Sequence, residues 1–362
     1  MRIAVLGGGN GSFAAAADLA LAGHEVRLWR RDSAAVAAHI AAGGHITVLD
    51  AAGIHEALPH LITDDLGTAV HGAELILCPT PATAQPDIAR RLVPLLQDGQ
   101  VVYLPPGTLG SVLMAQALHR HRPGASVAFA ETGTLPWLVR KRGPQEIAIT
   151  IRAKRLPTGV FPEALSRRAL GVIRQAFPDS IEDCGDALSA ALMNAGPIIH
   201  PPLIVMNAGP LEHFPKWDIH NEGTQPAIRR TTDALDLERI AIRAALGYGP
   251  PHFPLANHYA TEGEEWMYGR RSHDRLTESG DWRERILLQS HRYMMEDTRL
   301  GLSLLISAAD LAGVEAPLAR GFSAIGAAIR GDAPDHSGRT LADVGLGGLS
   351  RDELRQVLHH GF

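Results

Sequence analysis

Residues 1–31 constrain the fold more than any other part of the chain. An apolar run at 2–6 leads into Gly7-Gly8-Gly9-Asn10-Gly11-Ser12, an alanine-rich segment extends to Gly23, and residues 25–29 (EVRLW) are again largely apolar. A short apolar run followed by glycine is typical of a buried parallel strand, and the alanine-rich segment predicts a helix that a glycine ends. The order strand, turn, helix, strand predicts a βαβ unit that binds a dinucleotide.

The glycine-rich turn has the spacing of the dinucleotide fingerprint, with Ser12 where glycine or alanine is usual. Gly7 permits the tight turn, Gly9 lets a pyrophosphate approach the backbone, and a small third residue lets the helix pack closely on the strand. Backbone N–H groups at the helix start, around Asn10 and Gly11, are expected to face the phosphates. A structural glycine turn without a ligand is the alternative.

The residues after the second predicted strand bear on which dinucleotide binds. NAD-binding proteins usually have an acidic residue there to hold the ribose 2′-hydroxyl, whereas this chain has Arg30 and Arg31. Two cations suit a 2′-phosphate, so NADP is favoured over NAD, with Arg30 on the phosphate and Arg31 on the adenine or the phosphate. Asp32 lies close by and leaves NAD open. A solvated arginine pair that opens the next helix is the alternative.

Strand and helix patterns continue to alternate over the first half of the chain. The predicted strands are 73–77, 101–104 and 127–130, with 147–151 and a segment near Ile181 closing the domain, and the predicted helices are 88–96, 112–119 and 164–176. This alternation predicts an α/β fold with a doubly wound parallel sheet, whose ligands bind beyond the carboxyl ends of the strands. The loop that contains Thr80 is therefore expected to flank the cofactor. Cys78, in the same loop, is expected to be a small buried residue and not a nucleophile.

The pattern becomes helical from residue 186 onward. Helices are predicted at 187–200, 231–247, 282–313 and 317–330. We therefore expect two domains, an N-terminal Rossmann-type domain at 1–185 that binds NAD(P) and an all-α domain at 186–362 that binds the substrate. Two domains agree with a chain of 362 residues, because single cores rarely grow past ~250–300 residues.

His200 stands out in the helical half, within NAGPIIHPPLIVMNAG at 194–209. A helix is predicted to run toward His200 and to be broken by Pro201 and Pro202. An imidazole in an apolar stretch at such a break is a candidate general acid or base. A core histidine with its hydrogen bonds satisfied is the alternative.

Three charged residues, Arg292, Glu296 and Asp297, begin the segment HRYMMEDTRLGL at 291–302. Arg292 and Glu296 are four residues apart and could form a surface pair worth ~0.3–0.5 kcal/mol. Arg292 and Asp297 are five apart, so a regular helix would point them about 140° from each other. Both can face one pocket only if the helix starts or bends between them.

Taken together, GGGNGSFAAAADLALAGHEVRLW, NAGPIIHPP and HRYMMEDTRLGL resemble the octopine/nopaline (opine) dehydrogenase family over essentially the whole chain. The resemblance implies an enzyme that joins an amino acid to a 2-oxo acid and reduces the imine with NADPH, or catalyses the reverse oxidation. It implies that His200 is the acid/base group and that Asp297 orients it and raises its pKa. It also implies that Arg292 binds a substrate carboxylate, with Asn194 a further pocket residue. Arg299 stands where many relatives have proline, which leaves the donor amino acid open.

Two other functions remain open. A reductase of a simple 2-oxo or hydroxy acid, of the ketopantoate or glycerol-3-phosphate dehydrogenase type, usually relies on a lysine in the helical domain. The lysines here are Lys141, Lys154 and Lys216, none of which is expected in a helix at the cleft. A nucleotide sensor without turnover would leave His200 and Asp297 unexplained.

Composition excludes several other classes of function. A net charge of -5 offers no basic surface for nucleic acid, and the 18 histidines lack a metal-site spacing such as HExxH. Two cysteines without a CxxC motif favour a cytoplasmic protein without disulfides. The first strand leaves no room for a signal peptide, and no apolar run approaches the ~18 residues of a membrane span. The expected partners are the two small substrates and, by analogy only, a second copy in a homodimer.

Overall fold

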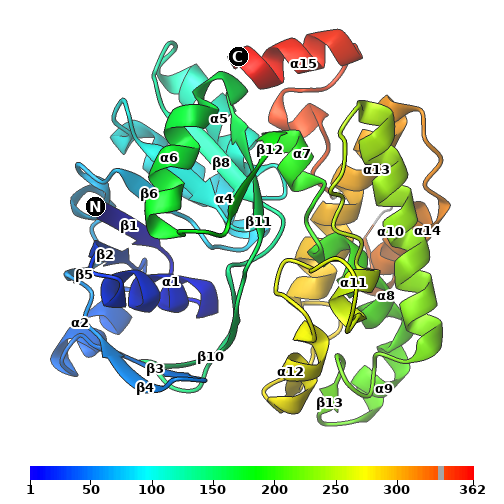
Figure 1. Ribbon diagram of the computed structural model, residues 1–362, viewed down its shortest axis with the longest axis horizontal. Coiled ribbons are helices and arrows are strands. Elements are labelled where there is room, and N and C mark those ends of the chain that lie inside the picture. Colours follow the sequence, from blue (N-terminus) through cyan, green and yellow to red (C-terminus); the bar gives the residue numbers. More distant parts are fainter. Residues whose placement is uncertain (333–337) are drawn as a thin grey trace. The chain divides into compact units, whose positions relative to one another are not determined.

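The computed structural model describes residues 1–332 and 338–362, which form two compact units. The α/β unit comprises Met1–Thr80, Ala84–Ala191 and Gln356–Phe362, and the helical unit comprises Pro81–Thr83 and Leu192–Arg355 (Figure 1). The main boundary therefore falls after Ala191, where the sequence analysis placed it after residue 185. In addition, the loop Pro81–Thr83 belongs to the helical unit, and the C-terminal residues Gln356–Phe362 belong to the α/β unit.

The α/β unit is built on an eight-stranded sheet. Its strands are β1 (Arg2–Leu6), β2 (Glu25–Trp29), β5 (Leu61–Thr63), β6 (Leu75–Leu77), β7 (Val101–Leu104), β8 (Ala128–Thr132), β11 (Leu156–Phe161) and β12 (Ile181–Asp186). Their order in the sheet is β12-β11-β8-β7-β6-β1-β2-β5. The strands from β8 to β5 are parallel, whereas β11 runs antiparallel to β8. Those parallel strands have the 3-2-1-4-5-6 order of a dinucleotide-binding sheet, which confirms the predicted fold class.

Helices flank this sheet and connect its strands. They are α1 (Asn10–Leu21), α2 (Ser33–Ala41), α3 (Leu66–Val70), α4 (Gln85–Leu92), α5 (Gly110–His121), α6 (Ser166–Ala176) and α7 (Ala187–Ala191), with single 3-10 turns at Ala82–Ala84, Val93–Leu95 and Glu163–Leu165. The end of α1 agrees with the prediction, because Gly23 adopts a φ of +83° directly after the C-cap. The backbone N–H of His24 then bonds to the carbonyl of Leu19, which closes the helix as a Schellman motif does.

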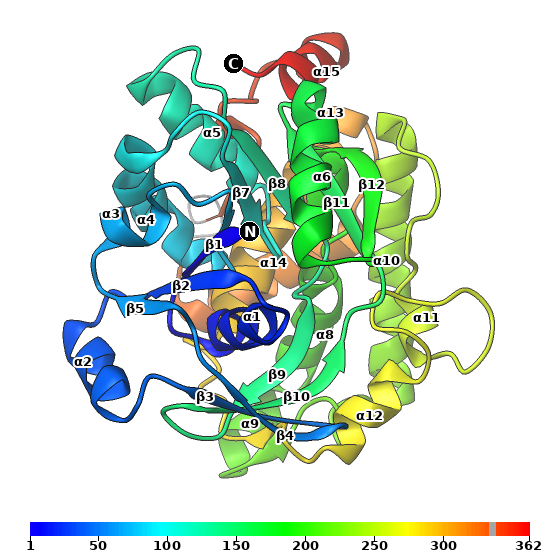
Figure 2. The same cartoon turned by 60° about the vertical axis from the view of Figure 1, so that its left-hand side comes forward.

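A second sheet, which the sequence analysis did not predict, covers the other side of α1. It has the order β4-β3-β10-β9 and consists of β3 (Ile46–Asp50), β4 (Gly53–Ala57), β9 (Trp137–Lys141) and β10 (Glu146–Arg152). Residues 147–151, expected to form a strand that closes the domain, lie in β10, which pairs with β3 and β9 in this second sheet. Helix α1 lies between β2 and this second sheet (Figure 2). A helix covered on both sides needs small residues around its circumference, which explains the buried alanine run.

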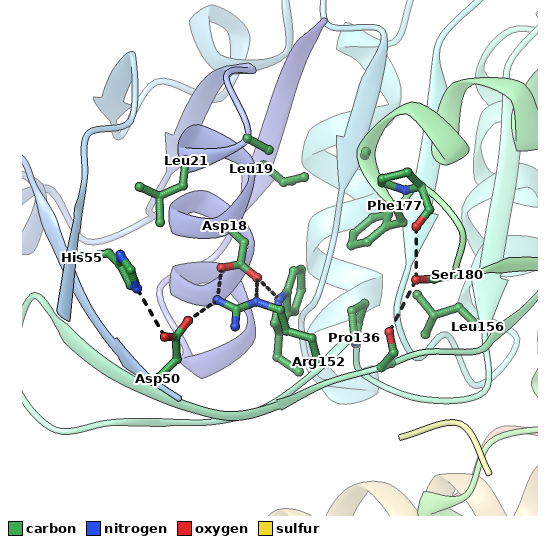
Figure 3. Close-up of a pocket in the computed structure, with 15 residues that line it drawn as sticks. Asp18, Leu19, Leu21, Asp50, His55, Pro136, Arg152, Leu156, Phe177 and Ser180 are labelled. Atoms are coloured by element: carbon green, nitrogen blue, oxygen red, sulfur yellow. Dashed lines mark hydrogen bonds and ion pairs between the residues drawn. The ribbon is translucent and has the colours of Figure 1, made fainter. Parts of the chain in front are cut away.

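An ion-pair network ties the second sheet to α1. Arg152 on β10 reaches Asp18 on α1 at 2.7 Å and Asp50 on β3 at 2.8 Å, and His55 lies 3.3 Å from Asp50 (Figure 3). These residues line one side of a cavity of about 450 Å³ whose other walls are largely apolar. The network fixes the second sheet near the C-terminal end of α1, away from the glycine-rich turn.

The helical unit is formed by a bundle and one short ribbon. Its helices are α8 (Gly196–Met206), α9 (Ala208–His213), α10 (Pro226–Leu246), α11 (Ala256–Tyr259), α12 (Ser272–Glu278), the π-helix η4 (Tyr293–Gly301), α13 (Leu302–Ala312) and α14 (Pro317–Arg330), with a 3-10 turn at Ala342–Val344. The ribbon pairs β13 (Trp217–Asp218) with β14 (Arg283–Glu284) and is the one departure from the predicted all-α domain among the described residues. Helix α8 packs against η4, α10 and α14 (Figure 1). The last helix, α15 (Arg351–His360), crosses from the helical unit into the α/β unit.

The prediction that a helix ends at His200 is wrong. The break comes earlier, at 192–195, and α8 continues through Pro201 and Pro202 to Met206. Each proline forfeits one backbone hydrogen bond, but α8 is buried along most of its length, and tertiary burial outweighs that loss. By length and composition, Ala187–Met206 would pass as a membrane-spanning stretch, yet 72% of its apolar window is buried inside the structure, as in a core helix.

Candidate active site

The glycine-rich turn has the geometry that the fingerprint predicts. Gly7 has a φ of +117°, and a Cβ there would lie 2.6 Å from Ser12 Oγ. Ser12 is buried and donates its hydroxyl to the carbonyl oxygen of Leu6 at 3.1 Å, so it locks the turn onto β1. Among the described residues, no atom lies within 4 Å of a Cβ placed on Gly9. The turn thus leaves open backbone at the start of α1, where an anion would bind.

Asn10 and Gly11 connect the turn to the segment around β9. Asn10 Oδ1 accepts a hydrogen bond from the backbone N–H of Lys141 at 3.0 Å. A Cβ on Gly11 would lie 2.9 Å from Leu135 Cδ1, so only glycine fits without displacing that side chain. Both residues therefore have structural contacts, and their contact with a cofactor stays a prediction.

Arg30 lies directly across the glycine-rich turn. A Cβ on Gly8 would be 3.1 Å from Arg30 Nε, and the guanidinium carbon is 5.3 Å from the centroid of the Phe13 ring. Its Nη1 donates to the carbonyl oxygen of Ala35 at 3.0 Å. Burial lowers the pKa of Arg30, opposed by the charge of Asp32.

Arg31 and Asp32 are placed differently from Arg30. The Arg31 side chain is 72% exposed and lies 3.6 Å from Asp87. Asp32 is the N-cap of α2, where its carboxylate accepts the backbone N–H of Ala35 at 3.0 Å. The Asp32 carboxylate thus has a structural partner, and Arg30 and Arg31 have different contacts.

The loop after β6 begins beside the glycine-rich turn. Thr80 Cγ2 lies 3.1 Å from a Cβ placed on Gly7, and Thr80 Oγ1 is 3.2 Å from Cys78 Sγ. Burial raises the pKa of the Cys78 thiol to about 11. The expectation that Cys78 is a buried apolar residue is confirmed.

The next residues of this loop, Pro81–Thr83, belong to the helical unit. The backbone N–H of Ala82 donates to Glu296 Oε1 at 2.8 Å, and its carbonyl oxygen accepts from Arg339 Nη2 at 2.8 Å. The backbone N–H and the backbone carbonyl of Ala82 are therefore both hydrogen-bonded to ionisable side chains. The sequence analysis missed this role of Glu296 and Arg339, because the partner is a backbone group more than 200 residues away.

The helical unit brings His200 and Asp297 together. His200 on α8 places Nδ1 at 2.8 Å from Asp297 Oδ2 on η4. In a π-helix each N–H bonds to the carbonyl five residues earlier, so residues five apart lie nearly above one another. Arg292 immediately precedes η4, and Asp297 follows it by five residues. The π-helix thus reduces the divergence of about 140° expected for a regular helix.

Two glycines allow α8 and η4 to approach this closely. A Cβ on Gly196 would overlap the Asp297 carboxylate, and a Cβ on Gly301 would overlap the ring of Pro197. Asn194 is buried, and its side-chain oxygen accepts the backbone N–H of Gly196 at 3.0 Å at the start of α8. Asn194 therefore supports the helix that carries His200.

Burial shifts the pKa values of the charged groups in this cluster. Burial, and then the positive charge of Arg292, lower the pKa of His200 well below its usual range. Burial raises the pKa of Asp297 to about 7, although Arg292 opposes the shift. Burial and the charge of Asp297 raise the pKa of Glu296 to about 7 as well. The expectation of a raised pKa for His200 is therefore wrong, because burial and the charge of Arg292 set the direction of the shift.

Aromatic residues fix the imidazole plane of His200. The Tyr293 ring stacks on it with centroids 3.6 Å apart and planes 10° apart. The Tyr293 hydroxyl is 2.8 Å from His220 Nε2, and His220 is buried. The guanidinium carbon of Arg292, an exposed residue, lies 5.0 Å from the centroid of the Tyr293 ring. The sequence analysis missed Tyr293 and His220, although Tyr293 directly follows Arg292 in the motif.

Known families match both halves of the chain. Residues 183–330 match the family model described as NAD/NADP octopine/nopaline dehydrogenase, alpha-helical domain. Residues 2–108 match the N-terminal domain of NAD-dependent glycerol-3-phosphate dehydrogenase. An opine dehydrogenase from Arthrobacter sp. (strain 1C) is 26% identical over 98% of this chain and 98% of its own length.

Solved structures share the fold over the full length. Octopine dehydrogenase with NADH and L-arginine has a TM-score of 0.70 at 17% identity, covering 98% of each chain. Yersinopine dehydrogenase with NADP⁺ has a TM-score of 0.67 at 14% identity, covering 100% of this chain and 98% of the other. Its helical half thus matches the alpha-helical domain of NAD/NADP octopine/nopaline dehydrogenases, and the whole chain is similar to an opine dehydrogenase.

Proposed function

We propose that this protein is an NADPH-dependent opine dehydrogenase, which joins an amino acid to a 2-oxo acid and reduces the imine, or catalyses the reverse oxidation. The observation that carries the proposal is the 2.8 Å contact between His200 and Asp297, with Arg292 one π-turn before Asp297. Condensing two carboxylic acids through an amine requires a cation for a carboxylate and a group that exchanges a proton with nitrogen. This cluster contains both.

Each residue of the cluster has a distinct role in the proposed reaction. The bound dinucleotide supplies the hydride for the imine carbon. His200 exchanges a proton with the substrate nitrogen through Nε2, because Nδ1 is bonded to Asp297. Asp297 holds the imidazole orientation, and Arg292 binds a substrate carboxylate through its guanidinium fork. Asn194 acts indirectly, by supporting the start of α8.

Substrate binding also changes the proton affinity of His200 in this proposal. The positive charge of Arg292 is one cause of the low pKa of His200. A substrate carboxylate on Arg292 would neutralise that charge and raise the pKa of His200. The acid form of His200 would then appear when a substrate is present to receive the proton.

The proposed cofactor rests on the α/β unit. Gly7 and Gly9 leave room for a pyrophosphate at the start of α1, so these residues fit a dinucleotide. NADP is preferred over NAD in this proposal because Arg30 lies across the turn and the nearest acid, Asp32, caps α2. The substrates are small molecules, and we further propose a cytoplasmic location, while a homodimer stays a prediction by analogy.

The test is NADPH oxidation with a panel of amino acids crossed with pyruvate, 2-oxoglutarate and glyoxylate, each also supplied alone. We expect oxidation only when an amino acid and a 2-oxo acid are both present, and loss of that oxidation in His200→Asn. Oxidation with a 2-oxo acid alone would overturn the proposal in favour of a simple reductase. Cofactor binding without oxidation by any pair would overturn it in favour of a sensor.

A further inference from the structure

We infer that Lys141 and Arg30 together form the binding site for the 2′-phosphate of NADP, and that Arg31 has no part in it. The sequence analysis gave this role to Arg30 and Arg31 and none to Lys141. The inference rests on the cofactor in the proposed function, but it is independent of the proposed substrates.

Lys141 and Arg30 reach the same aromatic ring from different sheets. Lys141 is the last residue of β9, and its Nζ lies 3.5 Å from the centroid of the Phe13 ring. The guanidinium carbon of Arg30, directly after β2, lies 5.3 Å from the same centroid. The hydrogen bond from the Lys141 backbone to Asn10 Oδ1 fixes the end of β9 against the first residue of α1. The two cations are therefore brought together by backbone structure.

Within the described residues no carboxylate forms an ion pair with either cation, although the charge of Asp32, at the N-cap of α2, acts on Arg30. The Arg30 side chain donates a hydrogen bond to the backbone carbonyl of Ala35, and Lys141 is half-buried with its ammonium on the Phe13 ring. Burial, and then the charge of Arg30, lower the pKa of Lys141 to about 8. Two adjacent cations that lose hydration without gaining an anion oppose folding. A phosphate bound between them would remove this cost.

Other charged groups around Lys141 do not supply the missing anion. The neighbouring His39 on α2 offers no negative charge, and burial first, then the charges of Arg30 and Lys141, lower its pKa. The charged side chains on α1 and β10, the elements that pack against β9, are Asp18, Glu146 and Arg152, and β3 and β4 of the same sheet carry Asp50, His55 and Glu56. Asp18 and Asp50 are paired with Arg152 at the far end of α1 (Figure 3), and Glu56 faces His45 and Thr47.

The position of this cation pair identifies the anion by its chemistry. Arg30 lies against Gly8 in the glycine-rich turn and directly follows β2, which is where dinucleotide-binding sheets hold the ribose 2′-position. Arg31 is mostly exposed and directed to Asp87. A 2′-phosphate on the ribose is therefore the group that would meet Lys141 and Arg30 but not Arg31.

The test measures binding by titration calorimetry without any substrate. The ligands are NADPH, NADH, adenosine 2′,5′-bisphosphate and adenosine 5′-monophosphate, and the matched control for Lys141→Met is Arg31→Met. We expect Lys141→Met to weaken NADPH and adenosine 2′,5′-bisphosphate by about tenfold or more, as for a lost charged hydrogen bond. The other two ligands should change by less than about twofold, and Arg31→Met should leave all four nearly unchanged.

Proton uptake gives a second and sharper measurement. Near pH 9 the free Lys141 amine is largely neutral, so binding a phosphate should draw a proton onto it. We expect the heat of NADPH binding to depend on the ionisation heat of the buffer, and that of NADH to depend on it far less. Lys141→Arg keeps a cation that does not deprotonate, so it should retain the preference for NADPH but lose this proton uptake.

Several outcomes would overturn the inference. They are an equal loss of NADPH and NADH in Lys141→Met, a larger loss in Arg31→Met, and unchanged proton uptake in Lys141→Arg. If Lys141→Met does not fold, Lys141→Arg still decides the question through proton uptake. Failure of the substrate panel with intact discrimination between NADPH and NADH would count against the proposed substrates alone.

Discussion

The two units each hold a cluster of charged side chains beside an aromatic ring, but the clusters differ in the signs of those charges. In the α/β unit, Arg30 and Lys141 share the Phe13 ring. In the helical unit, Arg292 lies beside the Tyr293 ring, and two carboxylates, Glu296 and Asp297, act on its charge. The first cluster consists of two cations without an ion-paired carboxylate among the described residues, with Asp32 acting on Arg30 by its charge, whereas the second contains acids, a base and a cation.

This difference separates binding from chemistry. A cluster of two cations attracts an anion, and the repulsion between the cations is offset for as long as that anion stays bound. A balanced cluster holds acids whose pKa values lie near 7, so a small change in local charge moves a proton. The same physical cause, burial of charge, thus prepares one unit to hold a phosphate and the other to exchange protons.

The largest effect should come from removing the base of the balanced cluster. His200→Asn should lower kcat/KM by about 10²–10⁴-fold, as expected for loss of a general acid/base group. The Kd for NADPH should stay the same, because the cationic cluster is untouched. Steady-state kinetics and calorimetry on the same preparation measure both quantities.

The exposed His213 on α9 provides the control, and His213→Asn should leave both quantities unchanged. A loss in kcat/KM of less than tenfold in His200→Asn would show that His200 is not the acid/base group. An equal loss of NADPH affinity would show that the two clusters are not separate in function.

A smaller effect should follow from pushing α8 and η4 apart. Gly301→Ala places a methyl group where Pro197 lies, and overpacking of this kind costs about 1–3 kcal/mol. The strain should lengthen the contact between His200 and Asp297, so both Tm and kcat should fall. Calorimetric melting and steady-state kinetics are the measurements.

Gly321→Ala, within α14, is the matched control. Of the described atoms, none lies within 4 Å of a Cβ at Gly321, so the gain in helix propensity should leave the protein equally or more stable. Since both glycines are helical, the difference between the variants isolates the steric overlap. If the two variants melt alike, close approach at Gly301 does not hold the cluster together.

The sequence predicted the first unit better than the second because its signals are local. The strand, glycine turn and helix at the N-terminus each follow from neighbouring residues, and α1 ends at Gly23 as expected. The second sheet was missed because its short strands meet only through pairing between β3 and β10, about 100 residues apart. Lys141 could not be assigned a role without that sheet.

The candidate catalytic residues were found through the family resemblance, but their geometry was not predicted. A helix of ordinary period separates Arg292 from Asp297, and nothing in the segment from 290 to 301 signals five-residue hydrogen bonding. The contact of His200 with Asp297 depends on Gly196 and Gly301, whose partners lie on another helix. Sequence patterns within one helix predict neither the π-helical hydrogen bonding nor the close approach of the two helices.

The smallest effect concerns stability, and it should have opposite signs in the two clusters. Glu296 has a pKa of about 7 in the folded chain against 4.5 in the unfolded chain, so the folded state binds more protons between these values. Stability should therefore fall as the pH rises from about 4.5 to 7. Glu296→Gln should remove part of this fall while keeping an oxygen for the N–H of Ala82.

Lys141 should produce the opposite slope in the adjoining pH range. Its pKa is about 8 in the folded chain and 10.5 in the unfolded chain, so the unfolded state binds more protons between these values and stability should rise with pH. Urea unfolding across both ranges should show Glu296→Gln changing only the acidic slope and Lys141→Met only the alkaline slope. NADPH should flatten the alkaline slope, because a bound phosphate restores the Lys141 proton. If the free energy of unfolding depends on pH in the same way in wild type and both variants, neither Glu296 nor Lys141 affects stability through its pKa.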